Sequence, residues 1–248
     1  MRSRTSAIGR RHRELVRGCL SVLVIAALFV LGVGWFGGPP IASAVVRTAL
    51  TSSGLEADDL QVTVDANPPL VVALGRADEV TIEGSNVRWN DLRAESLSLT
   101  LGTVNLVDRT AVSADGFLDG VDLAQPGADP ALASVAFRGS ARAARTTIRI
   151  DAATVEGLAL VAFKRALGAE PQSVTLVGPN VLRVQTSLGA VDGTMEIDAG
   201  GALVVRASIA TIGLVDPGAS TPIILTGVSV RDGDLELTGT LDVTDVLR

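Results

Sequence analysis

The residue types that most often perform chemistry in proteins are scarce in this sequence and lie at its N-terminus. The 248 residues include one histidine, His12, and one cysteine, Cys19, and no tyrosine. Residues 45–248 therefore lack the imidazole and thiol that Ser-His-Asp and Cys-His catalysis require. They also lack the thiolate and imidazole ligands of most zinc sites. The sequence predicts no catalytic residue, no metal site and no cofactor in this part of the chain.

Acidic pairs are the remaining candidates for acid–base or metal chemistry. Asp58-Asp59 and Asp78-Glu79 each place two carboxylates side by side, with no other ligand type clustered beside them. A glycosidase needs two carboxylates that flank a sugar in a cleft, and sugar binding usually also recruits aromatic side chains. The aromatic residues after position 45 are only Trp89, Phe117, Phe137 and Phe163. We interpret both acidic pairs as surface charge and predict that the protein is not an enzyme.

Basic side chains form two small local clusters. Lys164-Arg165 is one cluster, and Arg142 with Arg145 is the other. A guanidinium group matches the geometry of a phosphate, so either cluster could hold one. The alternative is that both are ordinary solvated surface charges.

The charges are divided unevenly along the chain. Residues 1–44 hold six arginines against one acidic residue, Glu14, which leaves 15 Lys and Arg against 26 Asp and Glu in residues 45–248. An acidic body lacks the basic face that displaces counterions from nucleic acid. We therefore expect no nucleic-acid partner.

Residues 18–37 are predicted to be a transmembrane anchor or signal segment. No charge interrupts the run from Gly18 to Phe36, and about 20 apolar residues span a bilayer as a helix. The arginines before it predict that residues 1–17 are cytoplasmic and that residues 41–248 lie outside the cytoplasm, in a single-pass protein of the cell membrane. Alternatively, Ala42-Ser43-Ala44 has the form of a signal-peptidase site, and cleavage after Ala44 would release the domain into the envelope.

Alternating apolar and polar residues predict a mainly β domain over residues 41–248. Leu97, Leu99 and Leu101 alternate with Ser96, Ser98 and Thr100, and similar runs recur through to residue 241. Strict alternation is typical of antiparallel strands that bury one face. Asp192-Gly193 and Asp232-Gly233 are predicted to be hairpin turns between such strands.

A few helices complete the predicted α+β fold. Helical segments are predicted at Ile41–Thr51, Pro69–Leu74 and Asp151–Leu167. Asp151 has the type and position of an N-cap residue, and Gly168 follows the third segment as a stop.

Three stretches of this sequence resemble the LmeA-like phospholipid-binding proteins of actinobacterial envelopes. They are Asn67-Pro68-Pro69-Leu70, the segment GRADEVTI at 75–82 and the segment LTGVSVRDGDL at 225–235. The resemblance covers roughly residues 41–243. It implies an elongated antiparallel β-barrel or curled sheet with a lipid cavity, similar to tubular lipid-binding proteins. It also implies an anionic phospholipid partner and a role in building envelope glycolipids or mannans. One departure is the absence of the aromatic-Pro-aromatic element that the family usually has before the short helix.

The resemblance gives a set of candidate lipid-contact residues on three segments. They are Pro68, Pro69, Leu70, Val71 and Leu74 at a cavity mouth, Leu97, Leu99 and Leu101 on a cavity wall, and Leu158 and Val161 on a lid helix. For each segment a plain structural role is the alternative: a turn, a dry core and a helix packed on the sheet. The predicted function is phospholipid binding by a membrane-tethered extracytoplasmic protein, and the alternative is a structural or adaptor protein of the envelope with a dry β core.

Overall fold

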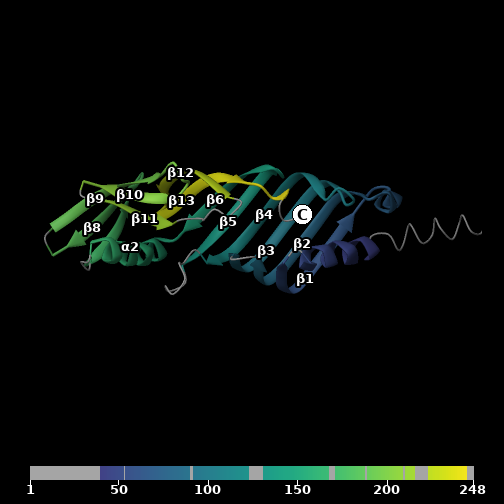
Figure 1. Ribbon diagram of the computed structural model, residues 1–248, viewed down its shortest axis with the longest axis horizontal. Helices are drawn as coiled ribbons and strands as arrows, with labels where there is room; N and C mark the ends of the chain where they lie inside the picture. The colour runs from purple at the N-terminus through teal and green to yellow at the C-terminus, as the bar shows by residue number, and fades with distance from the viewer. Residues whose placement is uncertain are drawn as a thin grey trace, which may run out of the picture.

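The fold is an elongated arrangement of two antiparallel sheets that follow one another along the long axis of the molecule (Figure 1). The structure is a computed structural model that describes residues 40–52, 54–89, 92–122, 131–167, 171–187, 189–208, 210–215 and 223–244. Strands hold 64% of the described residues, which confirms the mainly β prediction. The predicted cytoplasmic segment 1–17 and anchor 18–37 lie outside the described residues. Within the described residues, no helix combines the length and the apolar character needed to cross a bilayer.

The larger sheet, sheet A, has eight strands in the order β1-β2-β3-β4-β5-β6-β13-β12. The first six follow one another as hairpins, and the last two come from the C-terminal part of the chain. The strands are β1 (Leu55–Asp65), β2 (Arg76–Trp89), β3 (Leu92–Asn105), β4 (Thr110–Asp122), β5 (Leu132–Ser140), β6 (Ala143–Ile150), β12 (Ile223–Arg231) and β13 (Asp234–Leu241).

The smaller sheet, sheet B, is inserted between β6 and β12 in the sequence. Its strand order is β11-β10-β9-β8-β7, and helix α2 (Ala152–Leu167) packs against β7 and β11. The strands are β7 (Ser173–Val177), β8 (Val181–Thr186), β9 (Gly189–Ile197), β10 (Leu203–Ala207) and β11 (Thr211–Val215).

The sheets do not close into a barrel, so the barrel form of the prediction is wrong. A barrel would require the two edge strands of sheet A, β1 and β12, to pair with each other. They are instead separated by six other strands. The physical reason is the route of the chain, which leaves sheet A after β6, builds α2 and sheet B, and returns to add β13 beside β6.

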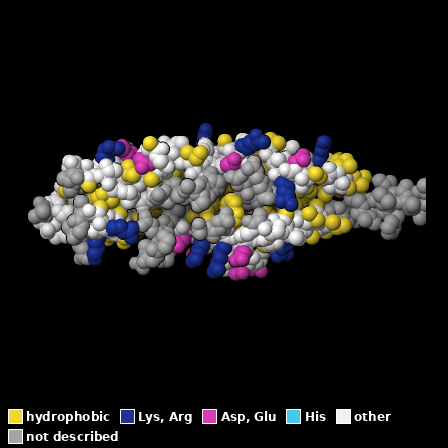
Figure 2. Space-filling model, viewed as in Figure 1, with side chains coloured by type: hydrophobic (Ala, Val, Ile, Leu, Met, Phe, Trp, Pro, Cys, Tyr) yellow, Lys and Arg dark blue, Asp and Glu magenta, His cyan; other side chains and the backbone are white. Residues whose placement is uncertain are grey.

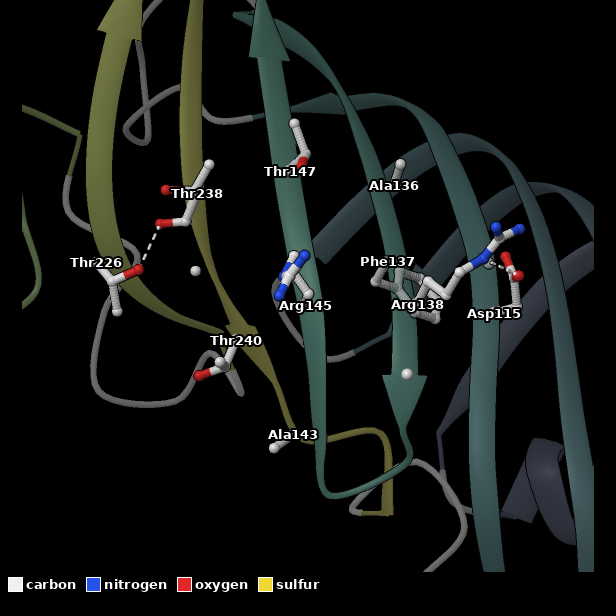
Figure 3. Close-up of a pocket in the computed structure, with 13 residues that line it drawn as sticks. Asp115, Ala136, Phe137, Arg138, Ala143, Arg145, Thr147, Thr226, Thr238 and Thr240 are labelled. Carbon is white, nitrogen blue, oxygen red and sulfur yellow. Dashed lines mark hydrogen bonds and ion pairs between the residues drawn. The ribbon is translucent and has the colours of Figure 1, made fainter.

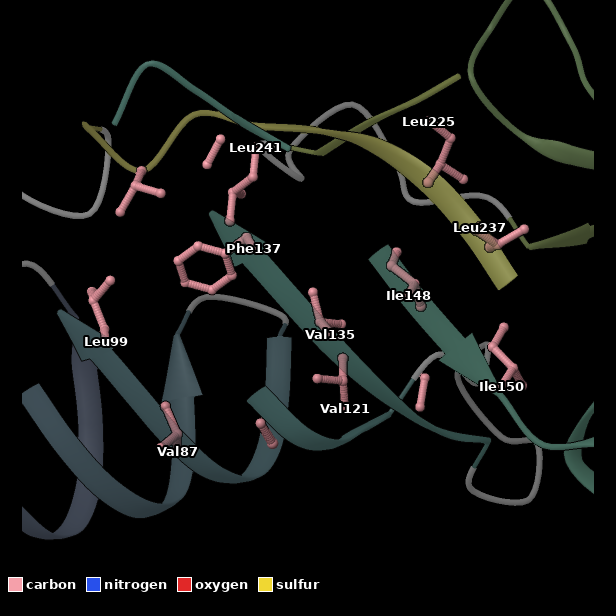
Figure 4. Packing of buried hydrophobic residues seen from close by; sticks show 14 of the residues in the cluster. Val87, Leu99, Val121, Val135, Phe137, Ile148, Ile150, Leu225, Leu237 and Leu241 are labelled. Atoms are coloured by element: carbon pink, nitrogen blue, oxygen red, sulfur yellow. The ribbon is translucent and has the colours of Figure 1, made fainter. Parts of the chain in front are cut away.

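Sheet A buries one face, which we call the inner face, and exposes the other, the outer face. Leu99 is opposite Ile82 on β2 and Leu101 is opposite Val80, and all four side chains are buried. The inner face continues across the sheet, where Phe137 and Ile148 point into the same interior as Leu237 (Figure 4). The inward orientation that alternation predicted for Leu97, Leu99 and Leu101 is confirmed.

One of the two predicted Asp-Gly turns is a turn. Asp232 and Gly233 join β12 to β13, and both have positive φ, 54° and 92°, as the tight hairpin turn requires. The prediction for Asp192-Gly193 is wrong, because both residues lie inside β9. Gly193 is needed there for a different reason: a Cβ atom would lie 2.4 Å from Cγ1 of Val205 on the neighbouring strand.

The three predicted helices are present. A helix covers residues 40–52, a 3-10 helix, η1, covers Pro69–Leu74, and α2 begins directly after Asp151. Asp151 is the N-cap of α2, because its carboxylate accepts hydrogen bonds from the Thr154 backbone N–H at 2.9 Å and hydroxyl at 2.6 Å. These hydrogen bonds, that of the hydroxyl first, hold the pKa of Asp151 below its ordinary value of 3.8.

Replacing the N-cap should make stability less sensitive to acid. We expect Asp151→Ala to lower the free energy of unfolding by about 1 kcal/mol at pH 7. Because the folded pKa is lowered, this contribution is present above pH 4 and is lost as the pH falls through the folded pKa. Denaturant melts at pH 7 and pH 3 test this. Asp151→Asn is the control, since it keeps the cap without titrating and should stay within about 0.5 kcal/mol of the parent at pH 7.

We expect substitutions at two neighbouring residues of β3, Leu99 and Ser98, to differ in how much they destabilise the fold. Leu99 is 3% exposed, so Leu99→Ala should lower the free energy of unfolding by about 2–5 kcal/mol. Ser98→Ala, on the exposed outer face, should stay within about 0.5 kcal/mol of the parent. Denaturant melts of lipid-loaded and delipidated protein measure both. If the Leu99→Ala loss is much smaller in the lipid-loaded protein, Leu99 lines a cavity that acyl chains fill, and the alternative of a dry core is wrong.

Candidate functional site

The predicted lipid-contact residues occupy three separate places with different exposure. On β3, Leu99 and Leu101 are buried and Leu97 is half-buried. In and before η1, Pro68 and Leu74 are exposed, and Pro69, Leu70 and Val71 are half-buried. On α2, Leu158 is half-buried and Val161 is exposed.

The structure does not bring these three segments together in one site. The short helix η1 contacts β2, whereas α2 contacts β7, β11 and β13. In Figure 1, α2 lies toward the opposite end of the long axis from β1 and β2. The residues on β3 share a face of sheet A, so Leu97, Leu99 and Leu101 form a continuous surface.

A groove of about 950 Å³ lies on the outer face of sheet A, over strands β4, β5, β6, β13 and β12 (Figure 3). Apart from Phe137, whose ring lies on the inner side, its side chains come from the outward positions of these strands, opposite the apolar interior. The lining consists of Asp115, Gly116, Ala136, Phe137, Arg138, Gly139, Ala143, Arg145, Thr147, Thr226, Thr238, Gly239 and Thr240. This groove is our candidate functional site.

A row of charged and polar side chains crosses the groove from strand to strand. Asp115 on β4 is opposite Arg138 on β5. Arg145 on β6 is opposite Arg138 on one side and Thr240 of β13 on the other. Because neighbouring strands are about 4.8 Å apart, the row spans roughly 15 Å. Two arginines are thus direct cross-strand neighbours, an arrangement that is unfavourable unless negative charge compensates it.

Only one of these two arginines is compensated within the described part of the chain. Arg138 forms an ion pair with Asp115. No acidic side chain of the described residues forms an ion pair with Arg145. Arg149 also points outward from β6, four residues after Arg145. Its guanidinium group lies 3.9 Å from the Glu236 carboxylate. The groove therefore carries one uncompensated positive charge at its centre, where Figure 3 shows Arg145.

Threonine hydroxyls surround this charge. Thr147 is opposite Thr238, one row along from Arg145 and Thr240. The Thr226 hydroxyl donates a hydrogen bond to the Thr238 carbonyl oxygen at 3.3 Å. Hydroxyl groups both donate and accept hydrogen bonds, so they can solvate an anion or its polar substituents.

The groove is closed beneath and apolar at two of its margins. On the inner side, the Phe137 ring lies over Gly116, where a Cβ atom would be 2.4 Å from the ring. On the outer side, Phe117 is 43% exposed beside the row of Thr147, and Ile224 is 65% exposed opposite Thr240. A polar centre with apolar margins fits an amphiphilic ligand that carries negative charge.

Of the basic clusters considered from the sequence, only Arg145 with its neighbours forms part of this groove. Arg142 lies in the turn between β5 and β6, and Lys164-Arg165 lies on α2. The sequence analysis missed Asp115, Arg138 and the four threonines. Alternation places them on the outer face of their strands, but only the pairing of β6 with β13 brings them together.

The two acidic pairs predicted from the sequence make local contacts in the described residues. Among these, no group of three or more His, Cys, Asp or Glu side chains could hold a metal ion. Asp58 accepts a hydrogen bond from the Asn86 side chain at 2.9 Å, and Asp78 accepts one from the Asn67 backbone N–H at 2.6 Å. The acidic pairs thus contribute to local loop and strand contacts.

The two faces of β6 should respond differently to substitution. Arg145→Thr removes a charge without an acidic partner, so the free energy of unfolding should stay within about 0.5 kcal/mol of the parent. Ile148→Ala, on the buried face of the same strand, should cost about 2–5 kcal/mol. Denaturant melts of both variants measure the contrast. A loss above about 1.5 kcal/mol for Arg145→Thr would mean that its role is structural.

Comparison with known proteins agrees with the resemblance found in the sequence. The model of the LmeA-like phospholipid-binding family matches residues 33–240, a range that includes the groove and both sheets apart from the last residue of β13. Among curated proteins and solved structures, none matches the chain. Since the family match covers most of the sequence, this chain belongs to the LmeA-like phospholipid-binding family.

Proposed function

We propose that this protein is a membrane-tethered, extracytoplasmic phospholipid-binding protein that takes part in cell-envelope lipid or lipoglycan assembly and is not an enzyme. Its family supports the ligand class. The charge-free run at 18–36 behind six arginines supports the tether and its orientation. The observation that carries the proposal is the uncompensated charge of Arg145 in the outer-face groove.

The lipid phosphate is proposed to bind at Arg145. A phosphodiester supplies the negative charge that the row of Asp115, Arg138 and Arg145 lacks. A guanidinium group can donate two parallel hydrogen bonds to a phosphate, and such charge-assisted bonds are stronger than neutral ones. The hydroxyls of Thr147 and Thr240 are placed to hydrogen-bond the ester oxygens or a polar headgroup.

The acyl chains are proposed to follow the apolar parts of the outer face. Ala136 and Ala143 are the small side chains beside Arg138 and Arg145 in the groove, and Phe117 continues this surface onto β4. Each methylene that leaves water contributes about 0.8 kcal/mol. Partial burial of two chains on such a surface would therefore add substantially to the affinity that the phosphate provides.

A structural or adaptor role is the second candidate, and one observation favours it. Leu99 and Leu101 are 3% and 0% exposed within one continuous apolar cluster, so protein atoms enclose these side chains. A dry core of this kind fits the adaptor role, whereas acyl chains in a cavity would need an accessible wall on β3. The outer-face groove is where the two proposals differ, since an adaptor has no need of an uncompensated cation there.

The decisive experiment compares two arginines of one strand. The full chain in detergent is titrated with phosphatidylglycerol, and binding is followed by native mass spectrometry. Loss of a hydrogen bond to a charged group is worth about 1.5–3 kcal/mol, so Arg145→Gln should weaken binding at least about tenfold. Arg149→Gln is the matched control on the same strand, and its affinity should stay within about twofold of the parent, since exposed ion pairs contribute little.

Two results would contradict the proposal in different ways. Absence of saturable phosphatidylglycerol binding by the parent would favour the adaptor role. Binding that Arg145→Gln and Arg149→Gln reduce equally would keep the lipid ligand but move it away from this groove.

A further inference from the structure

We propose that one end of the molecule is a membrane-docking surface that inserts apolar side chains into the bilayer interface. This surface, the apolar tip, consists of Ile41, Val45, Leu74 and Val107. The proposal rests on the proposed membrane tether, but it is independent of the outer-face groove and of the ligand bound there.

Leu74 and Val107 form a fixed pair of exposed apolar side chains. Leu74 is 75% exposed at the end of η1, and Val107 is 74% exposed in the turn between β3 and β4. The two segments touch at Gly75, where an added Cβ atom would lie 2.3 Å from Cγ2 of Val107. The Leu106 N–H also donates a hydrogen bond to the Gly75 carbonyl at 2.8 Å. The structure therefore holds both side chains outward side by side.

Ile41 and Val45 extend the tip onto the helix of residues 40–52. They are 62% and 61% exposed and four residues apart, so they lie on one face of the helix. Ala42 and Leu50 are buried, and they make up the side of the helix that packs onto the core. The exposed apolar face is thus not the face of the helix that packs onto the core.

These segments gather where residues 1–39 join the described fold. In Figure 1, the helix of residues 40–52 (purple) lies at the end of the long axis that bears β1 and β2. Figure 2 shows hydrophobic side chains concentrated at the same end. Monomeric proteins seldom expose apolar side chains in a group without an interaction partner.

Chain length identifies the bilayer as that partner. The charge-free run predicted to span the membrane ends at Phe36, and Ile41 follows only five residues later. At no more than about 3.6 Å per residue, Ile41 lies within about 18 Å of the membrane. A second copy of the chain fits less well, because stable interfaces bury about 800 Å² per partner. Four side chains expose only a few hundred square ångströms.

The charges beside the tip are mixed, so the contact does not depend on anionic lipid. Arg47, Arg76 and Arg109 flank the apolar residues in the sequence, as do Asp78, Glu79 and Asp108. Attraction to an anionic surface needs a net excess of basic residues. We therefore infer an interaction with the acyl region of any bilayer, driven by apolar burial.

The test places a fluorescent reporter at each end of the molecule. Full-length Val107→Trp and, as the control, Val161→Trp are reconstituted into phosphatidylcholine vesicles with or without brominated acyl chains. Val161 is 47% exposed on α2, toward the other end of the long axis. The emission of the parent, from Trp35 and Trp89, is subtracted.

The expected result is selective quenching at the tip. Because interfacial side chains reach about 5–10 Å into the headgroup–acyl boundary, brominated lipid should lower the Val107→Trp emission roughly twofold and leave Val161→Trp unchanged. Leu74→Trp reports on the same surface if Val107→Trp does not fold.

Equal quenching at both ends, or none at the tip, would overturn the proposal. Blue-shifted but unquenched emission at the tip would also overturn it and would indicate a second copy. Phosphatidylglycerol titration of the same variants separates failure at the tip from failure of lipid binding.

Discussion

The antiparallel pairing of β13 with β6 is the interaction on which the architecture depends. It joins the C-terminal hairpin, which begins at Ile223, to a meander that ends at Ile150. The six-stranded meander and the two-stranded hairpin thereby become one eight-stranded sheet. The same pairing holds α2 and sheet B as an insertion between β6 and β12. It also leaves β1 and β12 as distant edges, so the sheet stays open. Without this pairing, Arg145 would have no threonine row beside it.

The alternation of inward and outward side chains along β6 contributes both to the stability of this sheet and to its candidate binding site. On β6, Ile148 and Ile150 enter the core, whereas Arg145 and Arg149 point outward from the same strand. A shift of one residue in register would exchange the two faces, and burial of Ile148 and Ile150 therefore fixes the outward position of Arg145. Arg149 is compensated by Glu236, while Arg145 is not. The apolar core thus determines where the unbalanced charge must lie.

Local patterns predicted much of the fold and little of the site. The alternation of Leu97, Leu99 and Leu101 correctly gave their inward orientation, and Asp151 correctly marked the start of α2. The turn prediction for Asp192-Gly193 was wrong, because the glycine is needed to make room for Val205 on the neighbouring strand and not to form a turn. The barrel and the groove both depend on which strands meet across long stretches of sequence. That information is absent from any local pattern, so neither the choice between a barrel and a curled sheet nor the groove could be predicted from it.

The overall acidity of the protein bears on the roles proposed for the apolar tip and for the groove. Residues 45–248 carry 15 basic against 26 acidic side chains, so most of the surface is repelled by an anionic bilayer. A tethered domain with such a surface approaches the membrane most easily where apolar side chains are exposed and charges balance, as they do at the apolar tip. Repulsion elsewhere would keep the remainder of the elongated body away from the bilayer. At Arg145 an anionic lipid would meet favourable charge, so that the groove offsets the repulsion from the acidic surface around it.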